Sequence, residues 1–238
     1  MKRNILSIRP FLVATSVLLA TAILFSACKK NLDGGQNSPV AGLMAFNLAP
    51  DKSTVGISLS GNQLVSTPLA YTNYTGGYLN IYPGDRSIKS FNYMQDSSLA
   101  TSSFNFEPNK YYSLFLVGNN GTYQNVVAWD DLDSLSSTSG KAYVRYINAI
   151  PDSSAPTVTI TANGSNVVSN PVKFATVSAF TPVTPGEINV SVVNTNETAA
   201  NRTITLEGGK AYTLLLVGVA GATDSTKSVQ IKFIKNAG

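Results

Sequence analysis

The sequence predicts an all-β protein in which two tandem immunoglobulin-like β-sandwich domains follow an N-terminal lipoprotein signal peptide. Three observations support this: the composition, an internal repeat, and a series of short alternating segments separated by turns. Charged residues make up 13% of the 238 residues, whereas Ser, Thr and Asn number 27, 22 and 22. An uncharged polar composition of this kind is typical of β-rich chains and argues against a coiled coil or a charge-driven disordered chain.

The N-terminus has the three parts of a bacterial lipoprotein signal. The first nine residues carry three basic side chains, and residues 11–25 form an uncharged apolar stretch. Fifteen residues are fewer than the roughly 20 that a spanning helix needs, but they fit the apolar region of a signal peptide. The stretch ends in FSAC, residues 25–28, which resembles a lipobox, and Cys28 is the only cysteine. An uncleaved signal anchor is the alternative, but the place of the lone cysteine favours lipidation.

We therefore expect residues 1–27 to be a signal peptide and a lipid on Cys28 to anchor the protein to the membrane. Residues 28–40, rich in Gly and Asn, are expected to form a flexible tether. The expected location is the cell envelope, at the outer membrane, on its periplasmic face or at the cell surface. Cleavage leaves 14 basic and 13 acidic side chains, so the mature chain lacks the basic excess that binds nucleic acid.

The rest of the chain repeats with a period of about one hundred residues. Residues 45–51, AFNLAPD, align with residues 146–152, YINAIPD, and residues 110–118, KYYSLFLVG, align with residues 210–218, KAYTLLLVG. The matches keep their order and nearly their spacing. This pattern indicates a duplicated domain and not a solenoid, whose repeats are about 20–50 residues long.

The boundaries follow from the repeat and from a polar linker. We expect the first β-sandwich at residues 41–134, the linker at residues 135–139 and the second β-sandwich at residues 140–238. Because the linker buries little, the two domains are expected to fold independently. The first has four basic and seven acidic side chains and the second has eight and five. These opposite charges predict docking through a small, polar interface that salt weakens. The alternative is two undocked domains on a linker, with the charge asymmetry serving solubility.

Each copy has the pattern of short strands. Residues 157–161, TVTIT, alternate between polar and apolar side chains, and Asn163-Gly164 follows as a hairpin turn. Residues 210–217 form a nearly continuous apolar run, which predicts a strand buried on both faces. No segment after residue 40 has a convincing helical period. About seven strands per copy favour an immunoglobulin-like sandwich.

The second copy carries three segments that resemble a known family: AYVRYINAIPD, VTITANGSNVV and TITLEGGKAYTLLLVG. They are similar to domain-of-unknown-function family 4397, found in tandem in secreted and lipid-anchored bacterial proteins. The resemblance covers residues 140–234 closely and residues 41–131 more loosely. It implies a β-sandwich outside the cytoplasm, and it implies no reaction.

The chemistry that the sequence excludes is extensive. Without histidine, and with one cysteine, the chain has no Ser-His-Asp triad, Cys-His pair or Cys/His zinc site. We expect no catalytic residue, no metal, no cofactor and no enzymatic activity; the spacing of the acids gives no support to a glycosidase pair. Asp130, Asp131 and Asp133 are interpreted as a solvated charge run, with a partial calcium site as the alternative.

Aromatic residues concentrate in the first copy, which holds eight of the eleven tyrosines and the only tryptophan. Such side chains combine apolar area with a polar tip and recur at binding surfaces. Tyr78, Tyr82 and Trp129 are therefore the candidate ligand surface. Tyr71 and Tyr74 align with apolar residues of the second copy and are expected to pack in a core.

One modification site and a function complete the predictions. Ser134 lies in an Asp-Ser-Leu sequence that resembles the O-glycosylation site of some Gram-negative bacteria. We interpret the chain as a non-catalytic, lipid-anchored envelope protein that presents two β-sandwiches for adhesion or for binding a protein or glycan ligand. The alternative is a structural or accessory subunit of an envelope complex that handles glycans. No nucleic-acid partner is expected.

Overall fold

The computed structural model describes residues 39–135, 140–151, 155–194 and 197–237. These residues form strands and connections, and none of them is helical. Accordingly, the described part of the chain offers no helix with the length and apolarity of a membrane span. The predicted signal peptide, Cys28, most of the predicted tether and residues 136–139 of the predicted linker lie outside the described residues.

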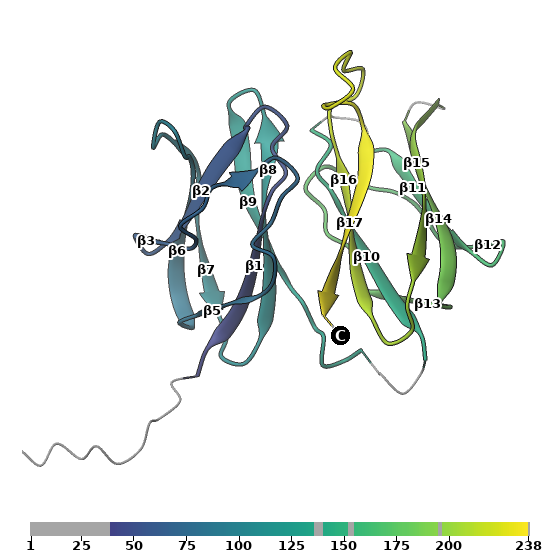
Figure 1. Ribbon diagram of the computed structural model, residues 1–238, viewed down its shortest axis with the longest axis horizontal. Coiled ribbons are helices and arrows are strands. Elements are labelled where there is room, and N and C mark those ends of the chain that lie inside the picture. The colour runs from purple at the N-terminus through teal and green to yellow at the C-terminus, as the bar shows by residue number, and fades with distance from the viewer. Residues whose placement is uncertain (1–38, 136–139, 152–154, 195–196, 238) are drawn as a thin grey trace, which may run out of the picture. The chain divides into compact units, whose positions relative to one another are not determined.

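The first copy consists of two sheets (Figure 1). Sheet 1 has the order β5-β1-β8-β9 and is formed by β1 (Ala41–Asn47), β5 (Leu79–Ile81), β8 (Tyr111–Asn119) and β9 (Thr122–Trp129). Sheet 2 has the order β3-β2-β6-β7, with β4 paired to β2; its strands are β2 (Thr54–Leu59), β3 (Asn62–Gln63), β4 (Leu69–Ala70), β6 (Gly84–Asn92) and β7 (Ser98–Phe106).

The second copy repeats this plan. Sheet 3 has the order β13-β10-β16-β17 and is formed by β10 (Ala142–Asn148), β13 (Thr181–Val183), β16 (Ala211–Val217) and β17 (Gln230–Ala237). Sheet 4 has the order β12-β11-β14-β15 and is formed by β11 (Thr157–Ala162), β12 (Ser165–Pro171), β14 (Gly186–Asn194) and β15 (Glu197–Leu206). Each pair of sheets encloses its own apolar core.

The predicted all-β sandwich class is confirmed, and the pairing adds a feature that the sequence patterns do not predict. The first strand of each copy lies parallel to the penultimate strand, with Gly42 opposite Tyr111 and Tyr143 opposite Ala211. All other pairs are antiparallel. β1 and β10 are therefore central strands, which explains why every residue in both is buried.

A third apolar cluster takes residues from both copies. Its buried members come from sheets 1 and 3 and the residues that follow β1 and β10: Met44, Phe46, Leu48, Phe115, Val117, Ile147, Ala149, Leu215, Val217 and Ile234. Sheets 1 and 3 thus bury both faces, one in a sandwich core and one against the other copy. This confirms the predicted two-sided burial of β16. The predicted polar character of the interface is wrong, because apolar side chains form this cluster.

A buried polar group, centred on Asp130 and Arg145, also joins the two copies. Arg145 Nη1 lies 2.6 Å from Asp130 Oδ1, and the two side chains are 2% and 0% exposed. Arg145 also donates hydrogen bonds to the hydroxyls of Ser113 and Thr213, both at 2.9 Å. The predicted solvated charge run is therefore wrong for Asp130, which is buried because it pairs with a cation of the other copy.

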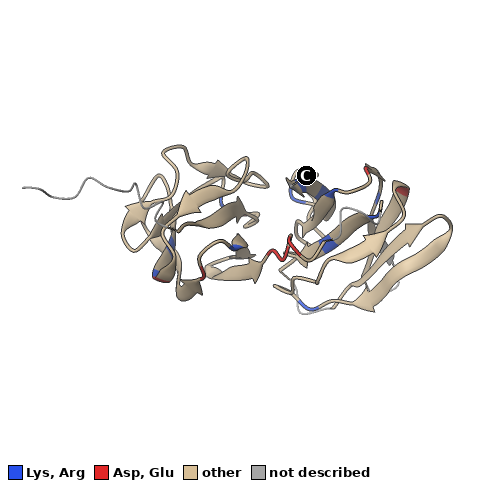
Figure 2. Ribbon diagram, turned by 90° about the horizontal axis from the view of Figure 1, so that it is seen from below, with Lys and Arg blue, Asp and Glu red and all other residues tan. Residues whose placement is uncertain are grey.

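The charges of the described surface are sparse. In Figure 2, most of the ribbon is tan, with short blue and red segments instead of a long run of either colour. No group of three or more His, Cys, Asp or Glu side chains among the described residues is arranged to hold a metal ion.

Candidate functional site

The two copies differ most clearly at one edge of sheets 2 and 4. In the second copy, β12 pairs with β11 from Ser165 to Pro171. In the first copy, the equivalent edge is interrupted: β3 pairs with one end of β2, and β4 pairs with the other. Five residues, 64–68, separate β3 from β4 and include Pro68, which has no N–H for a sheet ladder. The interruption leaves this edge of the first sandwich open.

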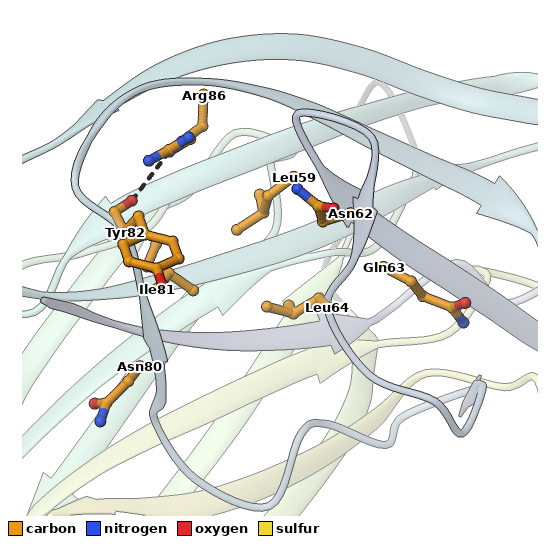
Figure 3. A pocket seen from close by; sticks show the side chains of 8 residues that line it. All are labelled: Leu59, Asn62, Gln63, Leu64, Asn80, Ile81, Tyr82 and Arg86. Atoms are coloured by element: carbon orange, nitrogen blue, oxygen red, sulfur yellow. Dashed lines mark hydrogen bonds between the residues drawn. The ribbon is translucent and has the colours of Figure 1, made fainter. Parts of the chain in front are cut away.

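A cleft of about 210 Å³ lies at this edge. We call it the Tyr82 cleft. One wall comes from the β2–β3 hairpin and the residue after it, and the other comes from β5 and the start of β6 (Figure 3). Its lining consists of Leu59, Asn62, Gln63, Leu64, Asn80, Ile81, Tyr82 and Arg86. Apolar side chains from the core thus meet amides, an aromatic ring and one cation, and no acidic side chain lines the cleft.

Tyr82 is the exposed aromatic residue of this cleft, with 71% of its surface open to solvent. Arg86 holds the local backbone: its Nε donates to the carbonyl oxygen of Tyr82 at 3.0 Å, as Figure 3 shows, and its Nη2 donates to that of Pro83 at 3.0 Å. The guanidinium carbon also lies 6.0 Å from the Tyr82 ring centroid, at the limit of a cation–π contact. These contacts preorganise the turn that carries the ring.

The same positions in the second copy lack these groups. Ile81 pairs with Ala41 as Val183 pairs with Ala142, which aligns the two edges residue by residue. By this alignment, the second copy has other residues at the three distinctive positions, namely Pro182 for Asn80, Thr184 for Tyr82 and Ile188 for Arg86. The amide, the ring and the cation are therefore features of the first copy alone.

A second hollow of about 520 Å³ adjoins the Tyr82 cleft and shares Leu64 with it. It is lined by the interruption, by the first residues of β4 and β5, and by the segment between these two strands: Leu64, Val65, Ser66, Thr67, Pro68, Leu69, Asn73, Tyr74, Thr75 and Leu79. The cleft alone is smaller than the roughly 300–1,000 Å³ of ordinary small-molecule sites. A ligand longer than the cleft can therefore extend along this edge.

The structure does not bring the predicted ligand residues together. The Tyr78 hydroxyl donates to Asp130 and accepts a hydrogen bond from Asn236, so it belongs to the interface between the copies. Trp129 is 51% exposed but lies on β9, at the opposite edge of sheet 1 from β5, with Lys110 Nζ 4.7 Å from the ring centroid. Only Tyr82 lines the cleft.

The environment of Tyr78 also changes its acidity. Burial raises the pKa of the Tyr78 hydroxyl well above its usual range, and the negative charge of Asp130 raises it further. Burial likewise raises the pKa of Tyr71 to about 12. Tyr71 and Tyr74 pack against the cluster between the copies, so they serve a core as expected, although this core is shared.

Ser134 is exposed near the end of the first described segment, and its hydroxyl donates to the carbonyl oxygen of Asp131 at 2.9 Å. Its O-glycosylation stays a prediction, as does the lipidation of Cys28.

Sequence patterns missed four polar residues of the cleft: Asn62, Gln63, Asn80 and Arg86. A signal for Arg86 was present in the alternation of β6. In the second copy, Ile188, Val190 and Val192 face the core, whereas the matching residues of the first copy are Arg86, Ile88 and Ser90. A cation at an inward-facing position of a strand indicates that this end of the sandwich is open to solvent, because the charged group must stay hydrated.

Comparisons with known proteins identify a family but no curated relative. The family model described as domain of unknown function (DUF4397) matches residues 41–155 and again residues 142–236, which confirms the tandem resemblance. No curated protein matches the chain.

Two solved carbohydrate-binding modules are similar in part. One is a family 41 module from streptococcal virulence factors that recognises α-glucan; identity is 10%, the TM-score is 0.28, and the match covers 80% of this chain and 96% of that one. The other is the family 26 module CBMbc of Eubacterium rectale, solved with maltoheptaose, with 10% identity, a TM-score of 0.25, and coverage of 84% and 98%. Both TM-scores lie below 0.5, so neither likeness bears on the function.

Proposed function

Because the chain belongs to the family described as domain of unknown function (DUF4397), we propose its function from its own surface: it is a non-catalytic glycan-binding protein of the cell envelope. The observation that carries the proposal is the Tyr82 cleft, where an exposed aromatic ring and three amide side chains line one hollow beside an interrupted sheet edge. The matching edge of the second copy lacks both the interruption and the ring.

The lining suits a carbohydrate. A pyranose ring presents apolar C–H faces and hydroxyl edges, so it gains by covering an aromatic ring while its hydroxyls find hydrogen-bond partners. Tyr82 offers the ring, and Asn62, Gln63 and Asn80 each offer an amide that both donates and accepts. Leu59 and Ile81, each 8% exposed, form an apolar floor. We propose recognition and not cleavage, because no carboxylate lines the cleft to supply the acid–base pair of a typical glycosidase.

The test is binding of residues 28–238 to a panel of neutral and acidic oligosaccharides, measured by calorimetry on every candidate that an array identifies. We expect Tyr82→Ala to weaken binding of the positive glycan about tenfold or more, as loss of an aromatic anchor does. Trp129→Ala is the matched control, since it removes an exposed aromatic at the other edge of sheet 1, and it should bind as the parent does. Absence of any glycan ligand, or equal losses in both variants, would overturn the proposal.

We propose in addition that Cys28 carries the lipid that holds the protein at the outer membrane. The basis is the sequence of residues 1–28, in which the only cysteine follows an apolar stretch that ends in FSA. Several acyl chains at about 0.8 kcal/mol per buried CH₂ make release from a membrane negligible. Cys28→Ser should therefore abolish fatty-acid labelling and release the protein from membranes. Persistent labelling of the variant, or an unlabelled parent, contradicts the anchor.

A further inference from the structure

We infer that the Tyr82 cleft selects glycans that carry a carboxylate, and that Arg86 is the residue that reads it. This inference rests on the proposed glycan function and narrows it to acidic sugars, of the uronic or sialic class. It follows from the position of Arg86, from the donors that its guanidinium leaves unused, and from the absence of acids in the lining.

Arg86 lies where burying a cation costs desolvation free energy, which a purely structural role would not require. It is half-buried at an inward-facing position of β6, where the second copy places Ile188, 1% exposed, in its core. The ion pairs of the described residues involve Lys52, Lys89, Lys110, Arg145 and Lys235, so Arg86 has no carboxylate partner among them. A partly desolvated cation without a counter-ion is stabilised when an anion is placed beside it.

The guanidinium is held in place and keeps donors free. Two of its five N–H groups are used, by Nε toward Tyr82 and by Nη2 toward Pro83. The described residues accept no further hydrogen bond from it, which leaves three N–H groups on the two Nη atoms. Two adjacent donors of a guanidinium match the two oxygens of a carboxylate. Because the side chain is already fixed, little conformational entropy is lost on binding.

The rest of the lining favours the same ligand. Every other polar side chain in the cleft is an uncharged amide or the Tyr82 phenol, so nothing there repels an anion. Asp85, the neighbouring acid, is exposed and accepts a hydrogen bond from Asn105 Nδ2 at 2.8 Å, on the strand opposite. The cleft thus combines one cation, one aromatic face and several amides, which is the set that an acidic sugar requires.

The experiment compares each acidic oligosaccharide of a uronic- and sialic-acid panel with its own methyl ester, which keeps the ring and removes the charge. We expect at least one acid to bind residues 28–238 about 10- to 100-fold more tightly than its ester, as charged hydrogen bonds imply. Arg86→Gln should reduce binding of the acid to the level of the ester. Arg86→Lys, which keeps the charge but loses the planar pair of donors, should fall between them.

Lys89→Gln is the matched control, because it removes a cation from the same strand outside the cleft, and it should bind the acid as the parent does. If an acid and its ester bind equally, if neutral or sulfated glycans alone bind, or if Lys89→Gln loses as much as Arg86→Gln, the carboxylate inference is overturned while the glycan function stands. Failure of every glycan overturns both.

Discussion

The buried cation of Arg145 joins the two copies. Arg145 interrupts the apolar strand β10, and its charge is met by Asp130 of the first copy together with two hydroxyls. Asp130 in turn accepts hydrogen bonds from Tyr78 and Ser113, so both ions have several partners. Such a pair adds little net stability over an apolar pair, but removing one member leaves a buried charge unpaired.

We therefore expect Arg145→Met alone to lower the free energy of unfolding by about 3–5 kcal/mol, and the double variant Asp130→Leu/Arg145→Met to recover most of it. Chemical denaturation of the four proteins of the cycle measures both effects. The control is Lys110→Met, which breaks an exposed pair with Glu107 at 2.6 Å and should leave the free energy of unfolding nearly unchanged. Additive losses in the double variant would show that the two side chains do not depend on each other.

The raised pKa of Tyr78 gives the stability an alkaline limit. The folded state holds this proton more tightly than the unfolded state, where tyrosine titrates near pH 10. Its contribution to stability is thus complete below about pH 10 and is lost as the pH rises toward the folded-state pKa. We expect the free energy of unfolding to fall above pH 10, and Tyr78→Phe to make that fall shallower by up to about 1.4 kcal/mol per pH unit. Parallel pH curves for parent and variant would contradict this assignment.

The edge strand next to β2 in the first copy and β11 in the second distinguishes the two copies. β12 pairs with β11 from Ser165 to Pro171, whereas residues 64–68 separate β3 from β4, and Leu64 of this segment lines the Tyr82 cleft. Between the matched pairs of the two ladders, the first copy has five residues, 64–68, where the second copy has three, 167–169. We attribute the interruption of the first ladder to these two additional residues. The two copies therefore share one plan but differ in this edge strand, and the proposed site lies beside the interrupted one.

Replacing residues 64–68, LVSTP, with residues 167–169, VVS, tests the role of this interruption. We expect a continuous edge strand, a closed cleft and a loss of glycan affinity of at least tenfold, with stability changed by no more than about 1 kcal/mol. Inserting LVSTP in place of residues 167–169 is the control, because it alters the second copy and leaves the first intact. Unchanged affinity in the first graft would show that the ligand does not use this edge.

Much of the fold can be predicted from the sequence, but the pairing of distant strands and the contacts between the copies cannot. Alternation in segments such as residues 157–161 predicts the strands, and the repeat predicts two copies. The parallel pairing of β1 with β8 is not predicted, since it joins segments about seventy residues apart through contacts that no local pattern encodes. The concentration of aromatic residues predicts Tyr82 as part of a ligand surface, and its ring is exposed. The partners of Tyr78 depend on the contact between the copies, which no local sequence pattern encodes.

An apolar interface joins the two copies of the domain. Equivalent residues from each copy take part: Phe46 with Phe115 in β1 and β8, and Ile147 with Leu215 in β10 and β16. The two copies thus meet through the same face, as subunits of a twofold dimer do. Since the contact is apolar, salt should not weaken it, and the radius of gyration of residues 28–238 should stay constant across a salt series.

The second copy alone should not be the stable monomer that the polar linker between the copies suggests. Residues 140–238 expose the apolar face of sheet 3 once the first copy is removed, and this face is suited to pairing with its own kind. We expect the fragment to form dimers or larger species by sedimentation, and Leu215→Glu to shift it toward monomer. A monomeric, fully stable parent fragment would contradict a shared interface.

Chemical-shift mapping can show directly whether the interrupted edge of the first copy is the binding site. Residues 28–238, labelled with ¹⁵N, are titrated with the tightest glycan of the panel. We expect the perturbed amides to cluster at residues 59–64 and 80–86, with the matching residues 162–167 and 182–188 of the second copy unchanged. Perturbations around Trp129 or in the second copy, or none with any glycan, would contradict the claim.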